Sequence, residues 1–365
     1  MSTTWPELGE RVVRARRAAG FTQSDLAAAV GMDRTAISKI ENGDRRVDSL
    51  ELGRIAEILK RPVSWFLTTP IPAVISRRQA REGIELAADI LLETLATDVE
   101  QLVEMGLLSP VRPPQLDLAV ESVESAESAA IQIRNQLQPD GALLDLARLA
   151  EQLGLYVFVL ELEPNVEGSY LALEAGGVAL VQGRDPSGKR RFTIAHELGH
   201  HVLADEYSSD WITGDRDERE RLISAFAIHL LLPRSAVLTR WRQLDGDSDP
   251  WNATIHLAAE YGVSWSAVCA QLRNLRLVDE ETRRALTRRR PVRADYLERM
   301  LGVPAEPPCP AVPPGFAAAV IKGYRRHLLG RERALELLRG TLAPDGLPEQ
   351  HEVPLEAMLD ELEPV

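Results

Sequence analysis

The segment from Arg190 to Leu203, RRFTIAHELGHHVL, contains two histidines four residues apart, with a glutamate directly after the first. On an α-helix, positions i and i+4 share one face, so His196 and His200 can direct imidazole nitrogens at a single metal ion. Glu197 lies one residue further round, where its carboxylate can accept a proton from water as that water attacks a carbonyl carbon. The spacing therefore predicts a zinc site with hydrolytic chemistry, although so short a pattern also occurs by chance.

A catalytic zinc site needs a third protein ligand and an open position for water. Residues 218–233, ERERLISAFAIHLLLP, are predicted to form a second helix with an apolar side, and two acids at its start, Glu218 and Glu220, are the candidate ligands. We expect one zinc ion as the cofactor. His201 and His229 lie elsewhere on these helices and are expected to be structural or surface residues.

Residues 6–67 have the pattern of short helices around a small core. Thr22 with Asp25 three residues later is a capping signal for a helix that ends at Gly31, and Asp33 can cap the helix that follows. Two short helices around a glycine turn are typical of a helix-turn-helix. An all-helical bundle is therefore predicted at the N-terminus.

The charge is distributed unevenly along the chain. Residues 1–66 carry 11 basic and 9 acidic side chains, whereas the remaining residues carry 31 and 46, within a total net charge of −13. Long-range repulsion therefore keeps most of the chain away from nucleic acid. The N-terminal segment is the part that can approach a phosphate backbone.

Composition bounds the class of protein. A chain of 365 residues with 45% hydrophobic and 27% charged residues can fold into two or three domains, each with its own core. We find neither a signal peptide nor an apolar run of about 18 residues, so a cytoplasmic location and no membrane partner are expected. Cys269 and Cys309 form no metal-binding pattern, which leaves histidine and carboxylate as metal ligands.

Residues 68–124 are predicted to be a proline-containing linker and an acidic amphipathic helix. Between Glu85 and Glu127 there are ten acidic residues and one basic residue. We interpret these acids as a solvated helix face. An acidic surface for self-association, or for masking the N-terminal bundle, is the alternative, and residues 84–105 are the expected dimer contact.

From residue 125 the pattern changes to mixed α/β, and residues 125–290 are assigned to one domain. Residues 176 and 177 are expected to form a turn between two strands, and residues 185–191 a polar loop before the histidine-bearing helix. Residues 291–365 are assigned to a proline-rich segment, a helical region and an acidic tail. The helices are expected at 126–137, 143–153 and, as a pair, 316–339, and the strands at 154–162, 169–173 and 177–181.

The residues around HELGH resemble a known family. RFTIA before this motif, with F-A and L-L-x-P downstream, is similar to the ImmA/IrrE metallopeptidases, which cut or control phage-type and stress-response repressors. The resemblance covers about residues 126–277 and implies a zincin-like α+β domain with helical C-terminal parts. Aligning the downstream motifs on Phe226 and Pro233 makes Glu220 the third zinc ligand. Ile223 and Ser224 depart from the alanine and asparagine that are usual there.

The segment from Phe21 to Leu67 closely resembles the Cro/CI-type (XRE) helix-turn-helix family. In that family the start of the second motif helix enters the major groove, and flanking residues contact phosphates. The resemblance implies a double-stranded DNA operator as partner. A homodimer is expected, because a single small helix-turn-helix domain buries little surface on DNA and gains specificity by reading two half-sites. The residues that it assigns to base edges are Arg34, Thr35, Ser38 and Lys39, and those that it assigns to phosphates are Gln23 and Asn42.

Together these features predict a multidomain, sequence-specific DNA-binding regulator whose zinc metallopeptidase domain cleaves a repressor, another regulatory protein or the chain itself. The alternative is a regulator whose zincin-like domain is a non-proteolytic sensor or partner-binding module. A second helix–glycine–helix pattern at residues 257–269 has no early basic residue in its second helix. We assign it to the helical part of the metallopeptidase domain.

Overall fold

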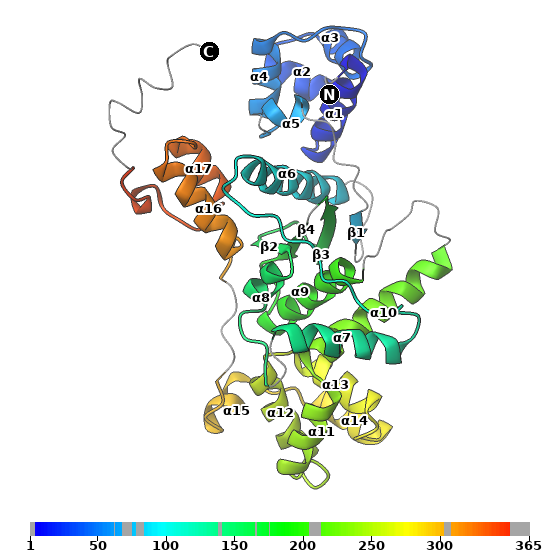
Figure 1. The fold of residues 1–365 in the computed structure, drawn as a ribbon. Coiled ribbons are helices and arrows are strands. Elements are labelled where there is room, and N and C mark those ends of the chain that lie inside the picture. The colour runs from blue at the N-terminus through cyan, green and yellow to red at the C-terminus, as the bar shows by residue number, and fades with distance from the viewer. Residues whose placement is uncertain are drawn as a thin grey trace.

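A computed structural model describes most of the chain (Figure 1). It contains a helical N-terminal bundle, a small sheet with helices on both faces, and further helices toward the C-terminus, which confirms the predicted multidomain fold class. The described residues are 4–61, 63–67, 75–77, 84–137, 141–164, 166–174, 176–203, 213–302 and 308–350.

The N-terminal bundle packs five helices around one core. Thr22 and Asp25 form the predicted capping box, and Gly31 takes a left-handed conformation (φ 71°) at the turn between the two motif helices. Asp33 occupies the N-cap of the next helix, but its side chain makes no capping hydrogen bond. The helices are α1 (Trp5–Ala18), α2 (Gln23–Val30), α3 (Arg34–Glu41), α4 (Ser49–Ile58) and α5 (Val63–Leu67).

The sheet has four strands in the order β1-β3-β4-β2. β2 and β4 are parallel, whereas β3 is antiparallel to both β1 and β4. Gly176 and Gly177, which were predicted to form a turn, instead belong to β4 and pair with Leu173 and Ala172. The turn prediction was wrong because the backbones of both glycines pair with β3 and lengthen the antiparallel ladder between β3 and β4. The strands are β1 (Ile75–Arg77), β2 (Leu155–Leu160), β3 (Gly168–Leu173) and β4 (Gly176–Gln182).

Both faces of this sheet are buried. Side chains alternate along a strand, so Val157 and Val159 of β2 belong to one hydrophobic cluster while Tyr156 and Phe158 belong to another. Burial on both faces explains the continuous apolar sequence of β2. The helices on the first face are α7 (Val123–Leu137), α8 (Leu146–Gln152), α9 (Ser187–Val202) and α10 (Thr213–Leu231), and those on the second are α6 (Ile84–Glu104), α16 (Pro314–Arg325) and α17 (Arg331–Leu337).

The acidic helix α6 is enclosed within the chain. No side chain described between residues 87 and 103 is exposed. Ile90 joins the core of the N-terminal bundle, and Leu92 joins the core under the sheet. Buried Asp98 forms ion pairs with Arg333 (2.6 Å) and Arg339 (2.5 Å). The expectation of a solvated face on this helix was therefore wrong, because its surfaces pack against other parts of the same chain. The expected dimer contact at residues 84–105 stays a prediction.

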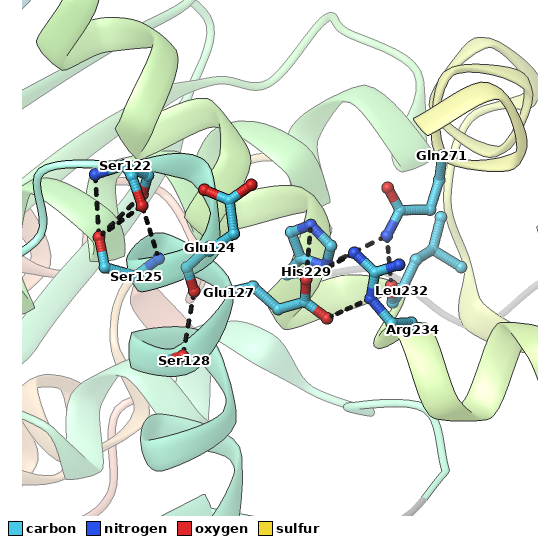
Figure 2. A network of polar contacts seen from close by, with 9 residues as sticks. All are labelled: Ser122, Glu124, Ser125, Glu127, Ser128, His229, Leu232, Arg234 and Gln271. Carbon is cyan, nitrogen blue, oxygen red and sulfur yellow. Dashed lines mark hydrogen bonds and ion pairs between the residues drawn. The ribbon is translucent and has the colours of Figure 1, made fainter. Parts of the chain in front are cut away.

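The C-terminal helices are joined to the sheet domain by a polar network (Figure 2). Glu127 of α7 accepts two hydrogen bonds from Arg234, and Gln271 donates to the carbonyl of Leu232 at 2.9 Å. His229 is buried between them, with Nδ1 3.3 Å from Gln271 Nε2, and burial lowers the pKa of its imidazole. His229 thus has a structural role. The helices of this part are α11 (Arg234–Gln243), α12 (Pro250–Tyr261), α13 (Trp265–Asn274), α14 (Glu280–Arg288) and α15 (Arg293–Glu298).

In the described part of the chain, no single helix combines the length and apolar composition needed to cross a membrane. One bent pair, Asp217–Leu231 with Arg234–Gln243, meets those criteria only when the two helices are taken together.

Phe316 tests whether the C-terminal helices are integral to the sheet domain. Its ring is fully buried and meets Phe158 edge-on, with centroids 5.1 Å apart. Phe316→Ala should lower the free energy of unfolding by about 3–5 kcal/mol, since it removes a large buried side chain. Urea denaturation measures this change, with the exposed Leu328→Ala as control. Equal stability of the two variants would contradict the packing described.

Candidate metal centre and nucleic-acid interface

Helix α9 carries the two histidines and begins earlier than expected. Residues 187–191, predicted to be a loop, form its first turns after Pro186 at the N-cap. Proline is favoured near a helix N-terminus because its fixed φ and missing N–H cost nothing there. Gly199 lies where α9 and α10 cross, and a Cβ on it would lie 2.9 Å from Ile223 Cγ2 and 3.1 Å from Phe226 Cδ1. The absence of a side chain at Gly199 therefore brings the two helices into close contact.

The structure brings the three predicted zinc ligands together. His196 Nε2 lies 3.0 Å from Glu220 Oε2, and His200 Nε2 lies 3.6 Å from Glu220 Oε1. A ligand atom from each residue lies within 4.8 Å of the other two. Tetrahedral zinc with bonds of about 2.0–2.1 Å has ligand atoms about 3.3 Å apart. The donor types and spacing therefore fit a three-ligand zinc centre.

Glu220 lies where the family pattern predicts the third ligand, although Ile223 and Ser224 depart from that pattern. Glu220 faces the histidines, whereas Glu218, the alternative ligand, is exposed to solvent. Ile223 fills the contact at Gly199. Ser224 Oγ lies 3.4 Å from His196 Nδ1, the nitrogen that faces away from Glu220. Hydrogen-bonding groups at the second nitrogen orient a ligating imidazole, so Ser224 is placed to do this for His196.

Glu197 lies beside this centre and under the first residue of β3. Its side chain is buried, and a Cβ on Gly168 would come within 2.5 Å of both Glu197 Oε1 and Thr193 Cγ2. Only glycine therefore fits at this position without displacing the carboxylate. Sequence analysis missed Gly168, because a glycine at the start of a short strand gives no signal of its own.

Tyr170 and His201 form a buried support behind His200. The Tyr170 ring is nearly parallel to that of His200, with centroids 6.3 Å apart, and its hydroxyl lies 3.1 Å from His201 Nδ1. His201 Nε2 lies 2.9 Å from the carbonyl oxygen of Leu153. Burial lowers the pKa of His201 to about 4, so the imidazole is neutral near pH 7. These contacts give His201 a structural role.

The outer face of α3 carries the residues predicted to read DNA. Ile37 and Ile40 are fully buried and fix the opposite face of the helix in the core. Ser38 is half-buried beside this face. The exposed residues among those predicted are Arg34, Thr35, Lys39 and Asn42. The helix can therefore present a polar face to a groove without disturbing the bundle.

Gln23 is held inside the bundle by an ion pair that the sequence did not reveal. Arg16 Nε donates to Glu41 Oε1 at 2.5 Å, and Gln23 Nε2 donates to Glu41 Oε2 at 2.8 Å. These bonds join α1, α2 and α3. The amide nitrogen of Gln23 is therefore already bonded to Glu41 within the bundle. A contact between Gln23 and a DNA phosphate stays a prediction.

Comparisons with known proteins agree with this architecture. Residues 13–66 match the family described as helix-turn-helix, and residues 150–273 match the IrrE N-terminal-like domain, a peptidase family of class M78. The chain thus joins an XRE-type helix-turn-helix domain to an IrrE/ImmA-like domain. Comparison with curated proteins gives no match.

Among solved structures, two regulators are similar at low identity. Bacillus thuringiensis PlcR, in complex with the peptide PapR7 and DNA, is 11% identical over 77% of this chain and 91% of that chain. The apo form of the competence regulator ComR from Streptococcus vestibularis is 9% identical over 92% and 90%. Both TM-scores are 0.18, too low to support an argument about this chain.

Glu220 and Glu218 provide a matched test of the metal centre. Glu220→Gln should weaken zinc binding at least about 100-fold, because it removes a charged ligand. Glu218→Gln, on the same helix but exposed, should bind zinc as the wild type does. Calorimetric titration of metal-free protein with zinc measures both. The reverse order of effects would assign the third ligand to Glu218.

Arg34 tests the nucleic-acid interface. Arg34→Ala should weaken binding to the operator by about 1–3 kcal/mol and relax the preference at one base pair, because arginine commonly pairs with guanine. Arg54→Ala removes a charge that is also exposed, from α4, and is the control. Fluorescence anisotropy with single-base operator variants measures both effects. Unchanged affinity and base preference in Arg34→Ala would refute the assignment.

Proposed function

We propose that this chain is a transcriptional regulator that binds an operator through α3 and uses a zinc-dependent peptidase centre on a regulatory protein. The substrate is a repressor, another regulator or a second copy of the chain. The observation that carries this proposal is the convergence of His196, His200 and Glu220, with buried Glu197 beside them. A site that only held metal would not need the additional carboxylate.

Each residue has a distinct role in the proposed reaction. His196, His200 and Glu220 hold zinc, which when bound supplies Lewis acidity toward water and a peptide carbonyl. Glu197 accepts a proton from the attacking water and delivers it to the leaving amine nitrogen. Ser224 and Tyr170 restrict the two imidazoles, so the donor geometry exists before a substrate arrives.

Operator recognition is proposed to involve a homodimer. A single small helix-turn-helix domain buries little surface on DNA and gains specificity by reading two half-sites. The contact expected at residues 84–105 stays a prediction, because other parts of the same chain already cover most of α6.

A sensor or partner-binding role without proteolysis is the second candidate. Two observations favour it: Glu197 is only 1% exposed, and β1 pairs along the outer edge of β3 beside the centre. An extended peptide would bind by adding a strand to such an edge, and β1 already occupies it. In this role, zinc or a partner would change the conformation of the domain and thereby DNA binding.

Glu197→Gln separates the two functions. The zinc-loaded wild type, incubated with the repressors of its host and by itself, should cleave one of them. Glu197→Gln should be slower by about 10²–10⁴-fold with its zinc content unchanged, since it removes the proton acceptor and no ligand. Mass spectrometry of the products and metal analysis measure these quantities.

Glu218→Gln serves as the charge-matched control, because it removes an exposed acid near the centre. If the wild type cuts none of these proteins and zinc alters its operator affinity, the sensor role is correct and the peptidase role is wrong.

A further inference from the structure

The turn between α12 and α13 repeats the geometry of the turn between α2 and α3. In both, a helix ends at a left-handed glycine, Gly31 (φ 71°) or Gly262 (φ 61°), and the next helix starts three residues later. Asp33 is the N-cap of α3, and Ser264, which accepts from the backbone N–H of Ala267, is the N-cap of α13. The pattern at residues 257–269 therefore shares the glycine turn and the helix spacing of the N-terminal motif.

The start of α13 has no basic residue, but basic residues lie at the end of α13 and in and after α14. Between these two helices lies a cavity of about 180 Å³. Its polar lining offers guanidinium groups together with two hydroxyl groups. The lining residues of this kind are Ser266, Arg273, Arg283, Thr287 and Arg290.

Most of these arginines lack an acidic partner. Glu280 binds both Arg283 and Arg284. Within the described part of the chain, no ion pair or hydrogen bond involves the guanidinium groups of five exposed arginines. They are Arg273, Arg276, Arg288, Arg290 and Arg293, which lie close together in the sequence and which we call the arginine surface; of these, Arg273 and Arg290 line the cavity.

The segment that carries the arginine surface is positively charged, whereas the chain as a whole is negatively charged. Residues 273–293 contain eight arginines and three acidic residues, a net charge of +5. Residues 1–66, which include the N-terminal helix-turn-helix, carry only +2, and the chain as a whole carries −13. The arginine surface is therefore the part of the chain best suited by charge to a polyanion.

We propose that the arginine surface is a second DNA contact, which holds the phosphate backbone without reading bases. The planar fork of arginine matches phosphate oxygens, and Ser266 adds a hydroxyl of a kind that commonly donates to phosphate. The Thr287 hydroxyl already donates to the carbonyl oxygen of Arg283 at 2.8 Å. α13 offers no basic side chain at its start, where base edges would be read.

DNA is favoured over an acidic protein because the chain already carries one DNA-binding motif and repeats its turn geometry here. α14 lies at the end of the molecule opposite to α3 (Figure 1). The two contacts can therefore engage separate DNA segments, which would bring two stretches of DNA together. This proposal does not depend on the metal centre.

The experiment uses the full chain with Arg34→Ala and Lys39→Ala, which removes the predicted base readers of α3. Binding to a duplex without the operator is measured by anisotropy over a range of salt concentrations. Adding Arg273→Ala with Arg290→Ala should make the negative slope of log affinity against log salt shallower by about 1.8, because each phosphate contact contributes about −0.9. Arg288→Ala with Arg293→Ala is an independent pair that should also make the slope shallower.

Arg325→Ala with Arg326→Ala is the matched control, since it removes two exposed charges from the end of α16. The control should leave the slope unchanged. Equal slopes for the control and for both test pairs would overturn the proposal. Unchanged DNA binding together with lost binding to polyglutamate would also overturn it, and would assign the arginine surface to an acidic protein.

Discussion

The close crossing of α9 and α10 is the contact on which the metal centre depends. Gly199 has no side chain, so Ile223 and Phe226 of α10 pack directly against the backbone of α9. This contact fixes α10 along its length and directs Glu220, about one turn before Ile223, toward the two histidines. A bulkier residue at Gly199 would separate the helices and pull the carboxylate away from the imidazoles. Ligand geometry is thus set by helix packing and not by the ligands alone.

The sheet couples this centre to the rest of the chain. β3 covers Glu197 at Gly168 and supports His200 through Tyr170, while its outer edge pairs with β1, from the segment that follows the N-terminal bundle. On the opposite face, α6 packs against both the sheet and the bundle, and Glu93 of α6 pairs with Arg14 of α1 at 2.6 Å. Packed elements therefore connect the peptidase-like domain continuously with the bundle that contains α3.

Local signals in the sequence predicted much of this structure. The capping box at Thr22, the left-handed Gly31, the apolar strand β2 and the i, i+4 histidines all depend on residues close together in the sequence, so their patterns were sufficient. Prediction failed where long-range contacts compete with local preference. The acids of α6 indicated a solvated face, yet Asp98 is buried because Arg333 and Arg339, more than 230 residues away in the chain, neutralise it.

The sequence alone determined the types of chemistry available, since the HELGH motif and the XRE-like helices carry their functional residues on single helices whose periodicity orients them. For the third ligand, the family resemblance had already favoured Glu220 over Glu218, and the structure places Glu220 beside the two histidines. Tertiary structure alone placed Gly168 over Glu197, enclosed α6 and brought Arg273, Arg283 and Arg290 around one cavity. These outcomes depend on which elements pack together. Which elements pack together depends on how the apolar surface of the whole chain is buried, and no single segment of the sequence carries that information.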